Sequence, residues 1–553
     1  MDPTTAFTGG MPVVLIGGAI LTALISILLL RIYRRAVIRA MSMTSGLTAT
    51  PFEPANVEST GKHSTSGIRL VDLSDHHTST GAGKFNYRQA ILSLNKTLFI
   101  YAAAGVIYSI ILTSAWSMAS GDGFAPTRFL FLFTCFIWPI FITAGFINHF
   151  LKTRILFLYG VLFILVSIFT LLRNPESSTG QFVYLWFFLN GPGTILLWLF
   201  LNRKVRAIGP LVLAFLIAVL TGSVILIDIA GNNDKLLENI AAIGSRLNLS
   251  APLMVIILVI AGFVIFGLFG WLLLRWIGKI YQKKRISDQT VTLDAIWLLF
   301  SIVQTFTLVF SGKLFIVTGI IAFIAYKAMV HLGFNIFFNT LHFGEGERRL
   351  LLLRVFSLGR RSEKLFDVIS GVSLRNGSIS LIAGPDLVTT NLEPHEFLSF
   401  MGGRLSRQFV SDEKDMQERV NNMDTRPDPD GRYRVNEFFC RADTWQMTMR
   451  KLAVDSNAVI MDLRSFSSIN QGCKFEIGQL LNDIPLDRIL LIVDESTDFN
   501  FLEETVRTLY QQITPSSPNY NSKEALLRYF TLKNKGKKEI KNLLLSLYNL
   551  QPR

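Results

Sequence analysis

The chain has few cysteines and few charged residues, and both shortages limit its class. Only three cysteines occur among 553 residues, which is too few for the disulfide framework of a small secreted domain. No cysteine and histidine cluster has the spacing of a zinc site, so we expect no metal. Charged residues make up 17% of the chain, half of it is apolar, and phenylalanine alone occurs 44 times. This composition is typical of a membrane protein.

The sequence also lacks the common nucleotide-binding motifs. It contains neither a Gly-x-Gly-x-x-Gly fingerprint nor a P-loop, which argues against a Rossmann dehydrogenase or an NTPase. The net charge of +14 does not indicate nucleic acid either. Residues 1–343 hold 25 Lys and Arg against 12 Asp and Glu, an excess of 13, whereas residues 344–553 hold 29 against 28, an excess of 1. The basic excess belongs to the apolar part, where loop charges set membrane orientation, so we expect no nucleic-acid partner.

Long apolar runs predict nine membrane spans. The first, Met11–Leu30, is followed by four arginines, whereas a signal peptide carries its positive charge before the apolar run. We therefore predict that residues 1–39 form a retained span with its N-terminus outside. An eight-span block fills residues 97–338, with stretches of about twenty residues. These stretches are Leu98–Met118, Phe129–Phe150, Ile155–Leu172, Phe182–Leu201, Ile208–Ile229, Pro252–Leu274, Leu293–Phe310 and Leu314–His331.

The basic residues predict the orientation of these spans. In the nine-span arrangement only five of the 25 Lys and Arg fall in outer loops, namely Arg128, Arg173, Lys235, Arg246 and Lys313. Such an asymmetry places the remaining loops and the C-terminal part in the cytoplasm, most simply at a bacterial inner membrane with lipid around the spans. Residues 40–96 are interpreted as a cytoplasmic linker, which is flexible and rich in Ser, Thr and Gly up to Ala82. Within it, Gly83–Leu94 is expected to form a short interfacial helix that leads into the next span.

One predicted span contains residues that favour a break. Asn190, Gly191, Pro192 and Gly193 lie near the middle of the stretch Phe182–Leu201. A broken helix is tolerated in a membrane only where protein or water surrounds it, and such breaks form binding sites in some transporters. An ordinary proline kink is the alternative. Few charges lie in the spans, and Asp294 and Lys327 are expected near span ends, where a lysine reaches the interface.

Residues 349–513 alternate short apolar runs with helical patterns. This order predicts a cytoplasmic α/β domain with a parallel sheet covered on both faces. The predicted strands are Leu350–Phe356, Ile379–Ala383, Tyr433–Cys440, Ala458–Leu463 and Arg488–Val493, and the predicted helices include Glu363–Val372, Pro394–Val410, Thr444–Ala453 and Phe499–Gln512. Between them, Asp412–Gly431 is interpreted as an exposed insertion. Residues 514–553 are predicted to be a basic tail with an amphipathic helix, Lys537–Tyr548.

The stretch Val459–Leu480 reads as a strand, a serine-rich loop and a helix. Within it, Cys473-Lys474-Phe475-Glu476-Ile477 matches the Cys-x-x-Glu-apolar part of the Trp-Cys-x-x-Glu-Leu helix of Toll/interleukin-1 receptor (TIR) domains, although Gly472 stands where the Trp would be. The run Leu352–Ser357, followed by Arg360, is similar to the first TIR strand and its loop. The resemblance implies a flavodoxin-like α/β fold behind the membrane domain. The insertion before Arg441 departs from the usual TIR spacing.

The TIR resemblance also implies a function. In TIR enzymes that cleave NAD the Glu of this motif is catalytic, which assigns that role to Glu476 and makes NAD a substrate, with no cofactor. The residues expected at the nucleotide are Phe356, Ser357, Arg360, Arg361, Asp386, Arg464 and Ser465. By the same resemblance the chain is a membrane-anchored effector or receptor in bacterial anti-phage defence that acts as a homo-oligomer or with partner subunits. Arginines suit a pyrophosphate, and Asp386 suits a ribose hydroxyl or a turn cap.

Three alternatives remain open at this stage. Glu476 complements the N-terminus of its helix without catalysis, as acidic residues often do. The chain is a non-catalytic receptor or scaffold that signals by TIR-like oligomerisation. Or it is a transporter or channel with a cytoplasmic regulatory domain, in which the Asn190–Gly193 segment belongs to the path.

Overall fold

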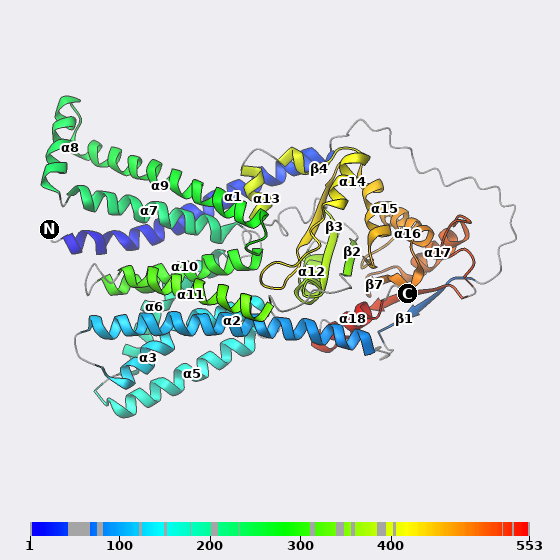
Figure 1. Ribbon diagram of the computed structural model, residues 1–553, viewed down its shortest axis with the longest axis horizontal. Helices are drawn as coiled ribbons and strands as arrows, with labels where there is room; N and C mark the ends of the chain where they lie inside the picture. The colour runs from blue at the N-terminus through cyan, green and yellow to red at the C-terminus, as the bar shows by residue number, and fades with distance from the viewer. Residues whose placement is uncertain are drawn as a thin grey trace. The chain divides into compact units, whose positions relative to one another are not determined.

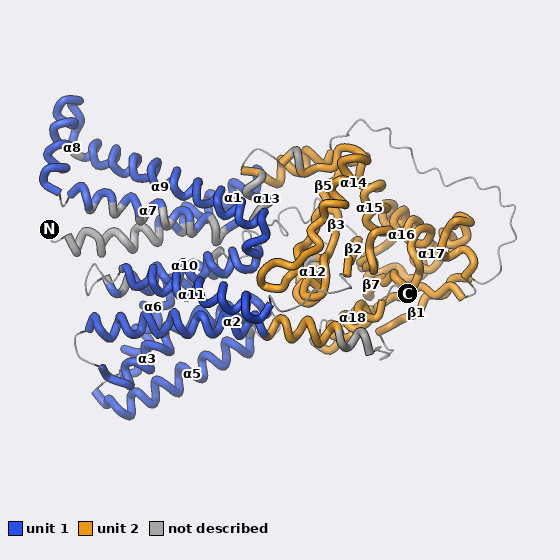
Figure 2. Tube along the Cα trace, viewed as in Figure 1, with its two compact units in different colours: residues 1–32, 96–340, 393–398 blue, residues 33–95, 341–392, 399–553 orange. Residues whose placement is uncertain are grey.

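The chain divides into two units, shown in different colours in Figure 2. The helical unit comprises residues 1–32, 96–340 and 393–398, and the sheet unit comprises residues 33–95, 341–392 and 399–553. The computed structural model describes residues 3–42, 67–74, 81–120, 124–148, 152–176, 178–200, 208–231, 233–309, 316–338, 348–354, 360–383, 394–401, 405–522, 524–533 and 536–550.

The apolar half of the chain forms long helices (Figure 1). They are α1 (Pro3–Ser42), α2 (Gly81–Ala119), α3 (Pro126–Phe136), α4 (Trp138–Ile147), α5 (Lys152–Arg173), α6 (Thr179–Phe200), α7 (Gly209–Gly231), α8 (Asp234–Arg246), α9 (Ala251–Gln282), α10 (Asp288–Val309) and α11 (Ile316–Phe338). Over their described residues the predicted apolar stretches coincide with helices. The stretch Phe129–Phe150 is divided between α3 and α4 beside Pro139, which lies in the first turn of α4.

Five helical segments in the described part of the chain are long and apolar enough to cross a membrane. They are Asn86–Ala119, Pro126–Ile147, Thr153–Arg173, Pro252–Gln282 and Val317–Phe338. These segments support a membrane protein, whereas the count of nine spans and the inner-membrane orientation stay predictions.

Helix α10 forms the centre of the helical unit. It packs against α4, α6, α7 and α11, and its Trp297 and Phe300 side chains are fully buried. Small residues let the neighbouring helices approach closely. A Cβ atom at Gly193 of α6 would lie 3.0 Å from the Phe300 ring, and one at Gly319 of α11 would overlap Thr305 of α10. Glycine at these contacts therefore permits the close packing that apolar helices in lipid depend on.

The sheet unit is built on eight strands in the order β1-β8-β7-β6-β2-β3-β5-β4. They are β1 (Arg69–Asp72), β2 (Arg348–Arg354), β3 (Gly377–Ile382), β4 (Phe409–Val410), β5 (Val435–Cys440), β6 (Ala458–Asp462), β7 (Ile489–Val493) and β8 (Leu526–Thr531). Each neighbouring pair of these described strands is parallel. The predicted parallel sheet is therefore confirmed.

Helices cover both faces of this sheet. Successive side chains of a strand point to opposite faces, so apolar residues of one strand enter two separate cores. In β2, Leu351 and Leu353 join a core with α14 (Glu413–Asn421), α15 (Trp445–Asp455), α16 (Gln471–Asp483) and α17 (Phe499–Gln511). Leu350 and Leu352 join a second core with α12 (Arg360–Ser373) and α18 (Lys537–Tyr548). A strand buried on both faces explains why β2, β6 and β7 are continuous apolar runs.

Two predicted boundaries of the domain are corrected. Residues 69–72, assigned to a flexible linker, form β1 and pair with β8 (Arg69 opposite Leu526), so that the blue strand lies beside the orange-red end of the chain in Figure 1. A four-residue strand carries too short a pattern to stand out in a Ser- and Thr-rich sequence. Residues 526–531, assigned to the basic tail, form β8, and the predicted helix Lys537–Tyr548 is present as α18.

Three further interpretations of the sequence differ from the structure. The helix expected over 394–410 ends at Met401 as α13 (Pro394–Met401), and Phe409 and Val410 form β4. The stretch 412–431 is not an exposed insertion, because Met416 and Val420 of α14 and Asp428 and Asp430 after it are buried. The helix expected over Gly83–Leu94 is present as the start of α2, but it belongs to the sheet unit, because Tyr87 and Ala90 pack with Val372, Leu544 and Tyr548.

We predict that α18 is essential to the stability of the sheet unit. Leu543→Ala removes a fully buried side chain from the core between α18 and the sheet, which costs about 2–5 kcal/mol. Leu526→Ala is the matched control, because Leu526 lies in β8 but is 41% exposed. Thermal unfolding of the purified full-length protein should show a clearly lower midpoint for the first variant only. Equal midpoints would mean that the segment is a dispensable tail.

Candidate functional site

The candidate site lies where the chain changes direction across the sheet. From β2 the chain passes through α12 to β3 on one side, and it later returns through α15 to β6 on the other side of β2. In open parallel sheets a ligand crevice forms outside the carboxyl ends of the strands at such a switch point. Arg354 at the end of β2 is opposite Asp462 at the end of β6. The β2–β6 edge is therefore the position at which to examine the predicted residues.

Glu476 lies beside this edge, on α16, the helix that follows β6. The residue is 3% exposed, and its Oε2 atom has no hydrogen-bond partner within the described residues. Burial raises the pKa of the Glu476 carboxyl to about 8, and the positive charge of Arg354 opposes part of that rise. A carboxyl that is buried, without a hydrogen bond at one oxygen, and close to a cation is an uncommon combination in a protein interior.

The structure bears on the alternative reading of Glu476. Helix α16 begins at Gln471, and its first turn contains no acidic residue. Glu476 is therefore too far along the helix to complement its N-terminus, since that effect is confined to the first turn. One neighbour of Glu476 is Cys473, three residues earlier on the same helix. Burial raises the pKa of this thiol, and the charges of Glu476 and Asp462 raise it further.

Asp462 and Arg464 form a buried ion pair that shapes the edge. Arg464 donates from Nε to Oδ1 of Asp462 at 2.7 Å and from Nη2 to Oδ2 at 2.6 Å, and the two side chains are 5% and 2% exposed. Arg464 Nη2 also donates to the carbonyl oxygen of Arg361 at 2.9 Å. The predicted nucleotide-binding residue Arg464 is thus used to fix the loop after β6 to the start of α12. We assign it a positioning role.

A second polar cluster lies on the more exposed rim of the same edge. Arg361 forms an ion pair with Asp494, which follows β7, and its Nη1 donates to Ser465 Oγ at 3.1 Å and Ser496 Oγ at 3.2 Å. The two serine hydroxyls are 2.9 Å apart. The Arg361 side chain is 40% exposed, so it remains accessible to an anion from solvent.

Arg361 and Ser465 were predicted from the sequence to lie at this site. Two further residues of the cluster, Asp494 and Ser496, were not predicted. Asp494 and Ser496 directly follow β7, which neighbours β6. Since the carboxyl ends of parallel strands share an edge, that position was the signal that could have identified them. Ser465 has a φ of 62°, a left-handed conformation that is uncommon for serine and marks a constrained turn.

Four other predicted residues add less. Phe356, Ser357 and Asp386 lie outside the described residues. Arg360 is the first residue of α12, and its side chain is outside the described ones. No group of three or more His, Cys, Asp or Glu side chains in the described chain is placed to hold a metal ion.

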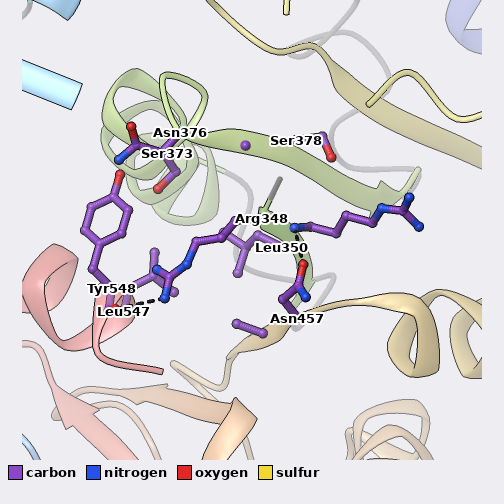
Figure 3. Close-up of a pocket in the computed structure, with 11 residues that line it drawn as sticks. Arg348, Leu350, Ser373, Asn376, Ser378, Asn457, Leu547 and Tyr548 are labelled. Carbon is purple, nitrogen blue, oxygen red and sulfur yellow. Dashed lines mark hydrogen bonds between the residues drawn. The ribbon is translucent and has the colours of Figure 1, made fainter. Parts of the chain in front are cut away.

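A hollow at the opposite edge of the sheet is too small for a nucleotide. In Figure 3, Arg348 extends from β2 toward Tyr548, and Asn457 points to the backbone of Arg349. Arg348 Nη2 donates to the carbonyl oxygens of Tyr548 and Leu550, both at 2.9 Å, and Asn457 Oδ1 accepts from Arg349 N at 2.8 Å. The hollow measures about 20 Å³, enough for about one water. Its polar groups hold α18 on the sheet.

The predicted membrane break is an uninterrupted helix. Helix α6 runs from Thr179 to Phe200 with Pro192 inside it. Thr194 Oγ1 donates to the Asn190 carbonyl oxygen at 2.7 Å, and the Asn190 side chain donates to the Cys135 carbonyl oxygen at 3.0 Å and accepts from Gln304 at 2.8 Å. These bonds let the helix continue past the proline, because they satisfy polar groups that would otherwise be exposed to an apolar surrounding.

We predict that the stability of the protein falls as pH rises from about 4.5 to about 8, in part through Glu476. The folded state holds the proton up to its raised pKa of about 8, whereas the unfolded chain loses it near 4.5. The stabilisation is complete below the lower value and is lost above the higher one. At about 1.4 kcal/mol per unit, it is on the order of a few kcal/mol. The melting temperature of Glu476→Gln should change less with pH across this range than that of the wild type, whereas the exposed variant Glu504→Gln should follow the wild type.

We also predict that Arg464→Ala destabilises the protein by roughly 3–5 kcal/mol, because the variant leaves the buried Asp462 carboxylate without its cation. Arg507→Ala is the control. Its pair with Glu503 lies on the surface, with side chains 62% and 38% exposed, and is worth about 1 kcal/mol or less. The melting temperatures of the two variants report the difference. Similar melting temperatures would rule out the positioning role of Arg464.

Comparison of the chain with protein-family models, with curated proteins and with solved structures finds no match to any of the three. The site is therefore interpreted from its own geometry and from the motif resemblance.

Proposed function

We propose that the sheet unit is a TIR-like domain of flavodoxin-like fold that binds NAD at the β2–β6 edge and hydrolyses it with Glu476. Strand β2 has β3 on one side and β6, β7 and β8 on the other, so the sheet is doubly wound with its switch point between β2 and β6. Strands β5 and β4 lie beyond β3, where the flavodoxin-like order has no strand, so the sheet departs from that order on this side. The motif Cys473–Ile477 lies on the helix directly after β6, as the resemblance requires. The position of the motif supports the proposal, because it ties Glu476 to the switch-point edge of the sheet.

The buried carboxyl of Glu476 is the observation that carries the proposal. Cleavage of the nicotinamide–ribose bond develops a positive charge on the ribose, and a nearby carboxylate stabilises such a charge. At neutral pH the Glu476 carboxyl is mostly neutral, since its pKa is about 8. A cationic nicotinamide ring brought beside it favours the ionised form. The desolvated setting strengthens this interaction, because charges attract more strongly where water is excluded.

The rim cluster supplies groups for the rest of the dinucleotide. Arg361 with the Ser465 and Ser496 hydroxyls offers a cation and two donors to a pyrophosphate. To bind it, Arg361 would share its guanidinium between Asp494 and the phosphates. Arg464 is buried against Asp462 and orients the loop without touching substrate.

The helical unit is proposed to anchor this domain at a bacterial inner membrane, as a homo-oligomer or with partner subunits in defence against phage. Five helices of span length and hydropathy support the anchor. A non-catalytic scaffold is the second candidate, and one observation favours it. Glu476 is only 3% exposed, so a substrate reaches it only if the edge opens.

The test is NAD turnover by purified full-length protein in nanodiscs. We predict that Glu476→Ala and Glu476→Gln lower the rate by about 10²–10⁴-fold, the usual effect of removing a catalytic group. Glu504→Ala, on the exposed face of α17, should leave the rate unchanged. Size-exclusion chromatography then checks that each variant assembles like the wild type. Wild-type protein that assembles but neither binds nor consumes NAD would reject the enzyme and favour the scaffold.

A further inference from the structure

The helical unit contains an ion pair that its anchoring role does not require. Asp294 of α10 forms a salt bridge with Lys327 of α11. Asp294 is six residues from the start of its helix, about 9 Å along the axis. Lys327 belongs to a segment long and apolar enough to span a membrane. Ionisable side chains in such surroundings are costly and in most proteins serve a function.

The surroundings of Asp294 are incompletely satisfied. Its Oδ1 atom is buried and has no hydrogen-bond partner within the described residues, and the same holds for the hydroxyl of Tyr326 on α11. The two groups interact electrostatically, and the ring of Tyr101 on α2 lies 6.4 Å from the Tyr326 ring, measured between centroids. In its ionised form Oδ1 can only accept a hydrogen bond, whereas with a proton it can also donate one. The Tyr326 hydroxyl is a nearby group that has no hydrogen-bond partner among the described residues and could accept it. Few buried polar groups in proteins remain unpaired without a reason.

Other charged groups do not replace this pair. Of the remaining helices packed on α10, α4 and α6 contain no charged residue, and α7 contains only Asp228, whose side chain is outside the described ones. Helix α2 packs on α10 through Tyr101 and Tyr108, and its described basic side chains, Arg88 and Lys96, form no ion pair with Asp294. Nearer the start of α10, Asp288 accepts a hydrogen bond from Tyr281 at 2.9 Å. On α11 the next titratable group is His331, one turn from Lys327, where it lies 3.2 Å from the Asn335 side chain. Lys327 is thus the one cation that faces Asp294 among the described side chains.

Lys327 also has a place to go if the pair opens. Its side chain is 38% exposed and lines a hollow of about 350 Å³ together with Phe323, Ile324, Ala328 and His331. A long lysine stem can lie along such an apolar wall while its ammonium group reaches water or lipid phosphates at the interface. The Asp294 carboxylate has a shorter side chain, is 20% exposed and stays on the central helix, so it does not follow the ammonium group.

We propose that the Asp294–Lys327 pair is a proton-binding site: Asp294 takes up a proton from water at Oδ1, the salt bridge opens, and the Lys327 ammonium turns into the hollow on α11. No other bond forms or breaks, and the site gains one positive charge, which the hollow exposes to solvent or lipid. The proposal is independent of NAD hydrolysis, since it concerns the helical unit alone.

Infrared difference spectroscopy of the full-length protein in nanodiscs tests this directly. Aspartate labelled with carbon-13 separates the carboxylic-acid band of Asp294 from that of glutamates such as Glu476. On stepwise acidification the wild type should gain a labelled acid band that Asp294→Asn lacks. Asp234→Asn, on the exposed helix α8, is the matched control and should keep the band.

A second variant guards against loss of folding in the first. In Lys327→Gln the half-buried Asp294 carboxylate has no cation, so it takes up a proton, and the labelled acid band should already be present at neutral pH. The proposal is overturned if wild type and Asp294→Asn gain the same labelled band. It is equally overturned if Lys327→Gln has no such band at neutral pH, because the pair would then be a permanent structural link.

Discussion

The candidate site depends on the ion pair between Asp462 and Arg464. A carboxylate at the end of a central strand is costly to bury, and two short charge-assisted hydrogen bonds from Arg464 offset that cost. The same guanidinium reaches the Arg361 carbonyl oxygen and so joins the loop after β6 to the start of α12. With this join in place, Ser465 takes its left-handed turn and meets Arg361 and Ser496 at the rim. The polar edge is therefore a consequence of one buried charge and its partner.

The two carboxyl groups at this edge, Asp462 and Glu476, have different surroundings. Asp462 is fully hydrogen-bonded to a cation, whereas Glu476 has an oxygen without a partner and a raised pKa. Environments that divide acidic groups in this way assign them different work, one structural and one chemical. The helical unit repeats the pattern with Asp294, which has one oxygen on Lys327 and the other unpaired. In both units the carboxyl group considered for function has one oxygen without a hydrogen-bond partner among the described residues.

Much of the sheet could be predicted from the sequence, because strands buried on both faces, such as Leu350–Leu353 and Ile489–Val493, are continuous apolar runs. The motif on α16 could be placed for the same reason, since the strand before it was clear. Strand β1 could not be predicted. Its four residues gain their partner only from β8, hundreds of residues away, and a local pattern contains no information about that pairing. The rim residues Asp494 and Ser496 directly follow the predicted strand Arg488–Val493, and the pairing of β7 with β6 places them at the site.

The pairing of β1 with β8 has a consequence for how the protein is made. Residues 69–72 leave the ribosome before the whole run of helices from α2 to α11, and residues 526–531 follow that run. During synthesis the early strand therefore waits, without a partner, while the intervening chain enters its own surroundings. Domains in general fold as units in the order in which they emerge. Here the sheet is completed only after the helical region has been translated. An error in that region therefore also prevents β1 from pairing with β8.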